Sequence, residues 1–414
     1  MTLPPSLAGR YQLVVLGRGH TFTECTSRLD AALAQAFGYL GVNVGKFLAH
    51  VHPGSSSAIL DRRLPSVGVF FGLSSAPMLS ALESEQIDNL LTDGSLIIPI
   101  VEDINAYSSF VPPQLASLNG ISLQSCGDGF ERLAARILEG FGLLRERRRL
   151  FISYRRVETS GVAAQLYEAL DAAGFDVFLD THGVLRPGEP FQEILWHRLA
   201  DTDVALLLDS PGFLVSRWTE EELARANNSN IQILQVLWPN QTEPAAAAFS
   251  AFHPLIMDDF EDTLTLGPAA RLRDANIASI VDEVEGLRAR AMGARQAFLV
   301  REFLQEARKA GLKVRTTLER LLIVSAPDGD HLVQPVIGVP DAERYEYLET
   351  LHRLEARRGR MYAPPPILLY DQKGLHSRWL KHLEWLNGSL SCARSLSLIS
   401  AEEWLTKLSR SSSV

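Results

Sequence analysis

Trp218 and Glu222 are the two residues whose types and spacing best suit chemistry on a nucleotide. They are four positions apart, so on a helix they share one face. A second group, Tyr154, Arg155 and Arg156, ends a short apolar run earlier in the chain. An aromatic plane, a carboxylate and guanidinium groups match the flat ring, the ribose hydroxyls and the phosphates of a nucleotide. Taken singly, each residue has a structural interpretation: Trp218 fits a core, and the acidic turn ending in Glu222 complements a helix dipole.

Four short apolar runs alternate with segments of helical period in the middle of the chain, which predicts βαβ units and a parallel sheet. The expected strands are Leu150–Tyr154, Phe175–Leu179, Val204–Leu208 and Ile231–Leu237, and the expected helices are Val162–Ala173 and Pro190–Ala200. Ligands of an open parallel sheet bind beyond the carboxyl ends of its strands. Tyr154, Asp180 and Ser210 end or follow three of these strands. We therefore expect them at one edge of the sheet, together with the two arginines and Glu222.

The motifs of this region resemble those of a TIR (Toll/interleukin-1 receptor) domain of the bacterial type. The stretch SRWTEEEL is similar to the family pattern Ser-x-Trp-Cys-x-x-Glu-Leu, with Thr219 in place of the cysteine, and FISYRR resembles the first-strand box. The turn-rich stretch THGVLRPGEPFQ resembles the BB loop, through which TIR domains assemble. The candidate assembly residues in this loop are His182, Gly183, Arg186, Pro187 and Gly188.

The resemblance implies an enzyme that cleaves the bond between nicotinamide and ribose in NAD+, with Glu222 as the catalytic carboxylate. It implies NAD+ as substrate, contacted by Tyr154, Arg155, Arg156, Asp180, Ser210 and Trp218, and no prosthetic group. It also implies a homo-oligomer formed through TIR–TIR contacts, in a bacterial cell that depletes NAD+ against phage. Two alternatives stay open: a TIR scaffold without catalysis, and a cyclase that makes a cyclic ADP-ribose signal.

The expected fold class is α/β, with a central flavodoxin-like TIR domain at residues 147–292 and two further small α/β, Rossmann-like domains. The first, at 1–144, is interpreted either as a degenerate TIR-like copy or as a generic Rossmann-like module. Its stretch GRGHTFTE holds Gly17 and Gly19 but lacks the spacing of a phosphate-binding loop. The last, at 295–414, has no family motif, and we expect a sensor or interaction module that takes an activating ligand or partner protein. Asp371 follows a predicted strand there, and we expect it in a turn.

Composition narrows the class of protein. The chain has 414 residues, a net charge of −9, and hydrophobic and charged fractions of 46% and 21%, so we expect no nucleic-acid partner. A basic run before the middle domain, from Arg145 to Arg149, is expected to be a solvated helix end and domain joint. Three distant cysteines and ten scattered histidines predict no metal site. No apolar run is long enough to span a bilayer, and we expect a cytoplasmic protein.

Overall fold

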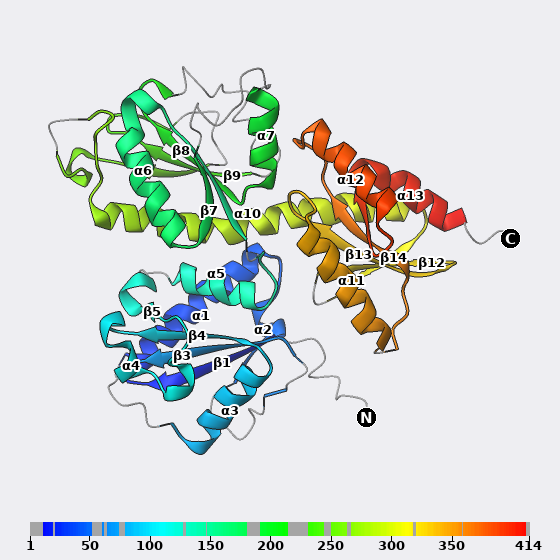
Figure 1. Cartoon of the computed structure of the whole chain (residues 1–414), viewed down its shortest axis with the longest axis horizontal. Helices are drawn as coiled ribbons and strands as arrows, with labels where there is room; N and C mark the ends of the chain where they lie inside the picture. Colours follow the sequence, from blue (N-terminus) through cyan, green and yellow to red (C-terminus); the bar gives the residue numbers. More distant parts are fainter. Residues whose placement is uncertain are drawn as a thin grey trace. The chain divides into compact units, whose positions relative to one another are not determined.

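The computed structural model of this chain describes residues 11–410 except 20, 52–59, 62–63, 74–78, 127–129, 146, 180–190, 214–230, 244–249, 263–265, 318–319 and 358. It has three five-stranded sheets with helices around them (Figure 1), which confirms the expected α/β class. The chain divides into two compact units, Met1–Glu146 and Arg147–Val414. The described part holds no helix that is both long and apolar enough to cross a membrane.

The first unit contains a sheet of order β2-β1-β3-β4-β5, in which every strand pair is parallel. The strands are β1 (Tyr11–Arg18), β2 (Leu48–Val51), β3 (Ser66–Gly72), β4 (Leu96–Val101) and β5 (Ile121–Ser122), and the helices are α1 (Phe22–Tyr39), α2 (Val44–Phe47), α3 (Ala81–Thr92), α4 (Tyr107–Phe110) and α5 (Glu131–Gly140). Every residue of β3 is buried, as expected for a parallel strand covered on both faces. Helix α3 begins with a reciprocal cap between Ser80 and Glu83, whose two hydrogen bonds are 2.7 and 3.2 Å long.

The second sheet has the order β10-β9-β8-β6-β7, also parallel throughout. Its strands are β6 (Arg148–Ser153), β7 (Phe175–Leu179), β8 (Val204–Asp209), β9 (Gln232–Leu237) and β10 (Ala251–Pro254), and its described helices include α6 (Arg156–Ala172) and α7 (Phe191–Asp201). Numbered from its own first strand, this is the 2-1-3-4-5 order of the flavodoxin-like folds, in which the ligand crevice lies beside the first strand. The first four strands confirm the expected ones within two residues. Gly174, with φ of +86°, follows the end of α6 as predicted.

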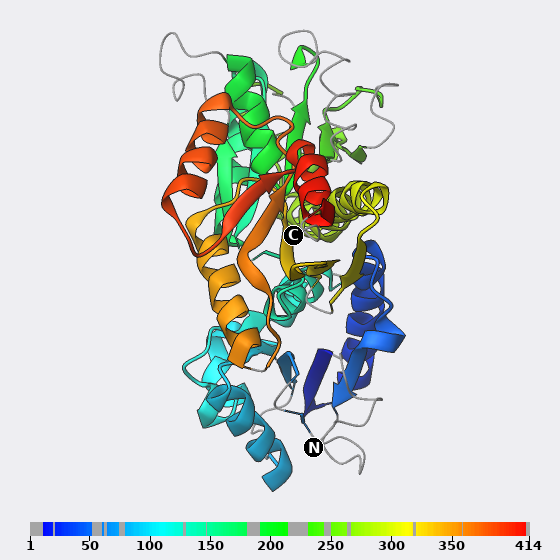
Figure 2. The same ribbon diagram turned by 90° about the vertical axis from the view of Figure 1, so that its right-hand side faces the viewer.

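The third sheet is mixed. Its order is β11-β12-β13-β14-β15, with antiparallel pairs from β11 to β13 and parallel pairs from β13 to β15. The strands are β11 (Lys313–Thr316), β12 (Leu322–Ala326), β13 (Gly329–Val336), β14 (Ala363–Tyr370) and β15 (Arg394–Ser397), with helices α11 (Ala342–Arg357), α12 (Ser377–Ser389) and α13 (Leu398–Arg410). Leucines of α13 pack in one apolar cluster, and those of α11 and α12 in another, so helices cover both faces of the sheet (Figure 2).

A single helix, α10 (Asp274–Lys309), joins the second and third sheets. The sequence predicts two helices here, Ala269–Met292 and Phe298–Ala310, and the break between them is wrong because the structure has one continuous helix. Residues on the first half of α10, such as Ile280, pack in the core of the second sheet, whereas Phe303 packs in the core of the third. Because both halves bury apolar side chains, the helix continues through Gly293 without a terminus.

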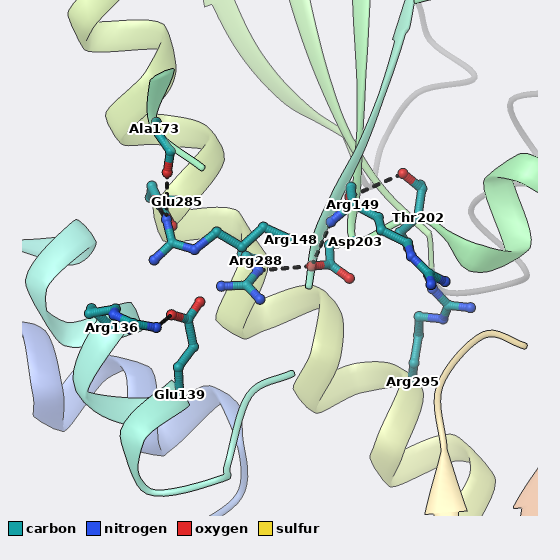
Figure 3. A network of polar contacts seen from close by, with 10 residues as sticks. All are labelled: Arg136, Glu139, Arg148, Arg149, Ala173, Thr202, Asp203, Glu285, Arg288 and Arg295. Carbon is teal, nitrogen blue, oxygen red and sulfur yellow. Dashed lines mark hydrogen bonds and ion pairs between the residues drawn. The ribbon is translucent and has the colours of Figure 1, made fainter. Parts of the chain in front are cut away.

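Buried ion pairs fix α10 against the second sheet (Figure 3). Arg288 donates to Asp203 at 2.8 Å, and both side chains are completely buried. Arg148 pairs with Glu285 and donates to the carbonyl of Ala173 at 3.1 Å. The basic run before β6 was expected to be solvated, and for Arg148, which is 8% exposed, this is wrong. A buried guanidinium needs a carboxylate partner, and α10 supplies one.

Asp371 follows β14 and accepts a hydrogen bond of 2.9 Å from the backbone N–H of Lys373. This confirms the turn expected at that position, in which an Asp side chain binds the backbone two residues further on.

Candidate active site

The carboxyl ends of β6, β8 and β9 meet at one edge of the second sheet because these strands are parallel and adjacent. Arg155 follows β6, Ser210 follows β8, and Trp238 follows β9. The N–H of Trp238 donates to the carbonyl of Asp209 at 2.9 Å, which holds the ends of β8 and β9 together. The structure thus brings the predicted first-strand and third-strand positions to the same edge.

Arg155 and Glu158 form an ion pair on the first turn of α6. The backbone carbonyl of Arg155 accepts from the N–H groups of Glu158 and Thr159, both at 2.9 Å, and from the Thr159 hydroxyl at 3.2 Å. Thr159 has non-helical angles, with φ of −137° and ψ of 19°. The three donors on one carbonyl therefore fix a kinked first turn, which sets where the Arg155 and Glu158 side chains lie.

Glu158 also connects this turn to the loop after β8. Its carboxylate accepts a hydrogen bond of 3.2 Å from the N–H of Gly212, and the hydroxyl of Ser210 acts on the same carboxylate. A side chain at Gly212 would overlap with the guanidinium of Arg155. Glycine at this position therefore leaves room for the guanidinium of Arg155.

The two carboxylates of this edge have different electrostatic environments. Partial burial raises the pKa of Glu158, but the nearby hydroxyl of Ser210, the hydrogen bond from Gly212 and the charge of Arg155 outweigh it and hold that pKa below its ordinary value. Asp209 is 3% exposed at the end of β8, and burial raises its pKa to about 6. Glu158 is a stable anion that fixes neighbouring donors, whereas Asp209 gains or loses a proton close to neutral pH.

The predicted substrate contacts occupy different positions at this edge. Arg155 is half-buried in its pair with Glu158, and Arg156 is exposed at the start of α6. Ser210 is buried beside Glu158. Tyr154 is 5% exposed and packs in the apolar core under the sheet. The structure therefore brings Arg155 and Ser210 together through Glu158 and leaves Arg156 facing solvent.

The other predicted residues lie outside the described part of the chain. They are Asp180, the assembly-loop residues His182, Gly183, Arg186, Pro187 and Gly188, and the pair Trp218 and Glu222. The described residues nearest to them in sequence are Leu179 at the end of β7, Phe191 at the start of α7, and Phe213, which is fully buried after the Ser210 turn.

Glu158 and Asp209 were not among the predicted site residues. The sequence holds a signal for each. Glu158 stands three positions after Arg155 at the start of a predicted helix, the spacing of an ion pair on one helix face. Asp209 ends an otherwise apolar strand, at the end where ligands of open α/β sheets bind.

This edge offers exposed and half-buried guanidinium groups for an anionic substrate, fixed hydrogen-bond donors, and a buried carboxylate that titrates near neutrality. Among residues with described positions, no group of three or more His, Cys, Asp or Glu side chains is placed to hold a metal ion.

The family model for the TIR domain matches residues 150–265 of this chain, which include the edge described above. No curated protein matches the chain. The flavodoxin-like strand order and the family match agree on the same segment, so the middle of this protein is a TIR domain.

Proposed function

We propose that this protein is an NAD+ glycohydrolase in which Glu222 is the catalytic residue. The observation that carries the proposal is the TIR-domain match across residues 150–265. Within this segment, SRWTEEEL resembles the family pattern around its tryptophan and glutamate. The charged edge at Arg155, Glu158 and Ser210 supports it, because phosphate-binding cations and fixed donors lie where an open α/β sheet binds ligands.

One carboxylate is sufficient for the proposed reaction. Nicotinamide leaves a cationic ring as a neutral molecule, so the enzyme need not donate a proton to it. The ribose develops oxocarbenium character as the bond breaks, as in glycoside hydrolysis. An anionic Glu222 near the ribose hydroxyls stabilises that positive charge, and water completes the hydrolysis. NAD+ is the substrate, and no prosthetic group takes part.

In this proposal the remaining predicted residues bind the substrate. Arg156 and Arg155 contact the pyrophosphate, Trp218 stacks on one of the two aromatic rings, and Ser210 supports the site through Glu158. Tyr154 contributes through the packing of the strand end because its side chain belongs to the core.

Assembly completes the proposed site. TIR–TIR contacts through the loop from His182 to Gly188 bring a second copy against it, so that activity rises with protein concentration. The regions before and after the TIR domain control that assembly, in a bacterial defence that removes NAD+ from the infected cell. A TIR scaffold without catalysis and a cyclase that forms cyclic ADP-ribose are the alternatives that the experiment must separate.

The test is nicotinamide release from NAD+ by the full chain, measured by chromatography at several protein concentrations with a crowding agent. Glu222→Gln should lower the rate by roughly 10²–10³-fold, the usual cost of removing one charge-stabilising group. Glu221→Gln is the matched control, since it removes the neighbouring charge and should leave the rate within about twofold of wild type.

Each outcome has a distinct meaning. Equal loss in both variants would place the effect in folding or in the net charge of the helix. Release unaffected by Glu222→Gln would mean that the catalytic residue is elsewhere. No release from wild type at any concentration would favour the scaffold, and a cyclic product would favour the cyclase.

A further inference from the structure

A cleft of about 720 Å³ lies within the second unit, between the TIR domain and the C-terminal part of the chain. One wall comes from β6, β7 and α7, and the other from α11, α12 and the loop before α11. Figure 1 shows that α7 and α12 lie side by side. The volume falls within the range of sites that bind small organic molecules, about 300–1,000 Å³.

Stacked rings close one side of the cleft. His197 on α7 stacks on Trp379 on α12, with ring centroids 5.5 Å apart and planes 14° apart. His382 meets the same indole edge-on at 5.8 Å. Burial lowers the pKa of His197 to about 4, so this ring is neutral at physiological pH. The cleft therefore presents flat apolar surface, which favours a planar ligand.

Carboxylates outnumber cations around the cleft. It is lined by five carboxylates, from Asp176, Asp201, Asp341, Glu346 and Glu349, and by three guanidinium groups, from Arg147, Arg149 and Arg198.

Most of the arginine charge is already neutralised. Arg149 pairs with both Asp201 and Asp341, and Arg147 pairs with Glu343 at 2.6 Å. The guanidinium of Arg198 lies over the ring of Phe178, 4.7 Å from its centroid.

Two of the carboxylates remain open. Asp176 and Glu346 are both exposed and make no ion pair with any residue that has a described position. They stand on opposite walls, Asp176 on β7 and Glu346 on α11. A cation between the walls is therefore attracted by a carboxylate on each wall. A neutral or anionic ligand of the same shape lacks this attraction.

A buried phenol adds a hydrogen-bonding group. Tyr345 lines the cleft and is 4% exposed, and its hydroxyl interacts with the hydroxyl of Ser395. Its neighbour Ser395 donates its own hydroxyl to Asn387 at 3.2 Å.

We infer that this cleft is a binding site for a small organic cation with a planar ring, held by the indole of Trp379 and by the carboxylates of Asp176 and Glu346. Such a ligand contacts both α7 of the TIR domain and α12 of the C-terminal part. The two walls are also joined directly, because the carboxylate of Asp201 at the end of α7 accepts a hydrogen bond of 3.1 Å from the N–H of Val339. A ligand in the cleft therefore adds a further connection between the same two parts, and it does so whether or not the TIR domain cleaves NAD+.

The test uses three indoles that differ in charge: tryptamine, a cation; tryptophol, which is neutral; and indole-3-acetate, an anion. Each indole is titrated against the full chain. Saturation-transfer NMR detects its binding, and the titration gives its dissociation constant. We expect tryptamine to bind about tenfold more tightly than tryptophol, and indole-3-acetate to bind more weakly than both. Tryptamine should also slow hydrogen exchange in the peptide that contains α7.

Variants locate the binding. The double variant Asp176→Asn, Glu346→Gln should remove the preference for tryptamine over tryptophol. Trp379→Ala should weaken the binding of both tryptamine and tryptophol. Trp379→Phe keeps an aromatic ring and should retain the preference for tryptamine over tryptophol, so it serves as the control for misfolding of Trp379→Ala. Trp385→Ala is the matched control, since Trp385 is on the same helix and 63% exposed but does not line the cleft.

Three results would overturn the inference. The first is that none of the indoles binds to a chain whose melting curve is that of the folded protein. The second is that all three bind equally well, which would remove the role of charge. The third is that tryptamine binds unchanged to Trp379→Ala and to the double variant, which would place it elsewhere.

Discussion

The first and second sheets of this molecule have the same strand order and the same parallel pairing, yet they differ where their central strands end. In the first sheet, β1 ends at Arg18 beside β3, with Gly17 just before that residue and Gly19 just after it. Gly17 has φ of +132°, and a side chain there would overlap with the carbonyl of Phe71. Backbone packs on backbone, which explains these glycines without a phosphate.

In the second sheet, the equivalent strands β6 and β8 end in charged and polar side chains. Arg155, Glu158 and Ser210 interact across the two loops, and Asp209 is buried beneath them. The lesson is that strand order positions an edge but does not make it a site. At the second edge, described side chains can contact a substrate, and the TIR family model matches this segment.

The largest expected effect tests the packed edge. Gly17→Ala forces a side chain into the contact with Phe71 at a backbone angle that disfavours L residues, and should lower the unfolding free energy of the first unit by about 3 kcal/mol. Gly38→Ala, at a helix position with nothing within 4 Å, is the control and should be neutral or slightly stabilising. Denaturant unfolding measures both. A neutral Gly17→Ala would show that this edge is open.

A smaller effect is expected at Asp209. Its pKa is raised to about 6 in the folded chain from 3.8, so the folded state binds the proton more tightly than the unfolded state. The protonated Asp209 contributes fully to the unfolding free energy below about pH 4. This contribution is lost as pH rises through 6, where the buried carboxyl ionises in the folded chain. Asp209→Asn removes this loss and should raise the unfolding free energy at pH 7 by about 2 kcal/mol, with no gain below pH 4.

Thermal melts at several pH values measure the difference between Asp209→Asn and wild type. A destabilised variant at pH 7 would mean that the Asp209 anion has a partner in the folded chain.

The smallest expected effect tests the charged edge. Gly212→Ala should displace the Arg155 guanidinium and weaken the hold of Glu158 on the loop after β8. If the proposed reaction is correct, kcat/KM for NAD+ falls about tenfold while the melting temperature changes little, since the overlap involves the end of a flexible side chain. Gly267→Ala, with nothing within 4 Å, is the control. An unchanged kcat/KM would separate Arg155 from substrate binding.

The elements that sequence predicted well are those with one dominant signal. Parallel strands such as β3 and β8 are nearly continuous apolar runs, and α6 ends at a glycine. The sequence did not predict β13, which contains Pro335, or α11, which is a strongly polar helix. Both depend partly on segments distant in sequence: β13 pairs with the preceding β12 but also with β14, and α11 buries Tyr345 and Leu348 against the third sheet.

The site was predicted to a similar extent. Arg155 and Ser210 were expected at the carboxyl edge of the second sheet, where the structure has them, because the ends of hydrophobic runs predict the ends of strands. Glu158 was missed because a glutamate on a first helical turn usually serves the helix dipole. Its contact with Gly212 depends on how closely two loops approach, which no local pattern encodes.

Helix α10 makes the TIR domain and the C-terminal part a single cooperative body. At 36 residues it is about 54 Å long, and it contributes core side chains to two sheets without an intervening linker. Neither sheet can therefore melt alone without exposing half of a helix whose other half is still packed. Calorimetry of the intact chain should resolve residues 147–414 as one transition, whose calorimetric and van't Hoff enthalpies agree.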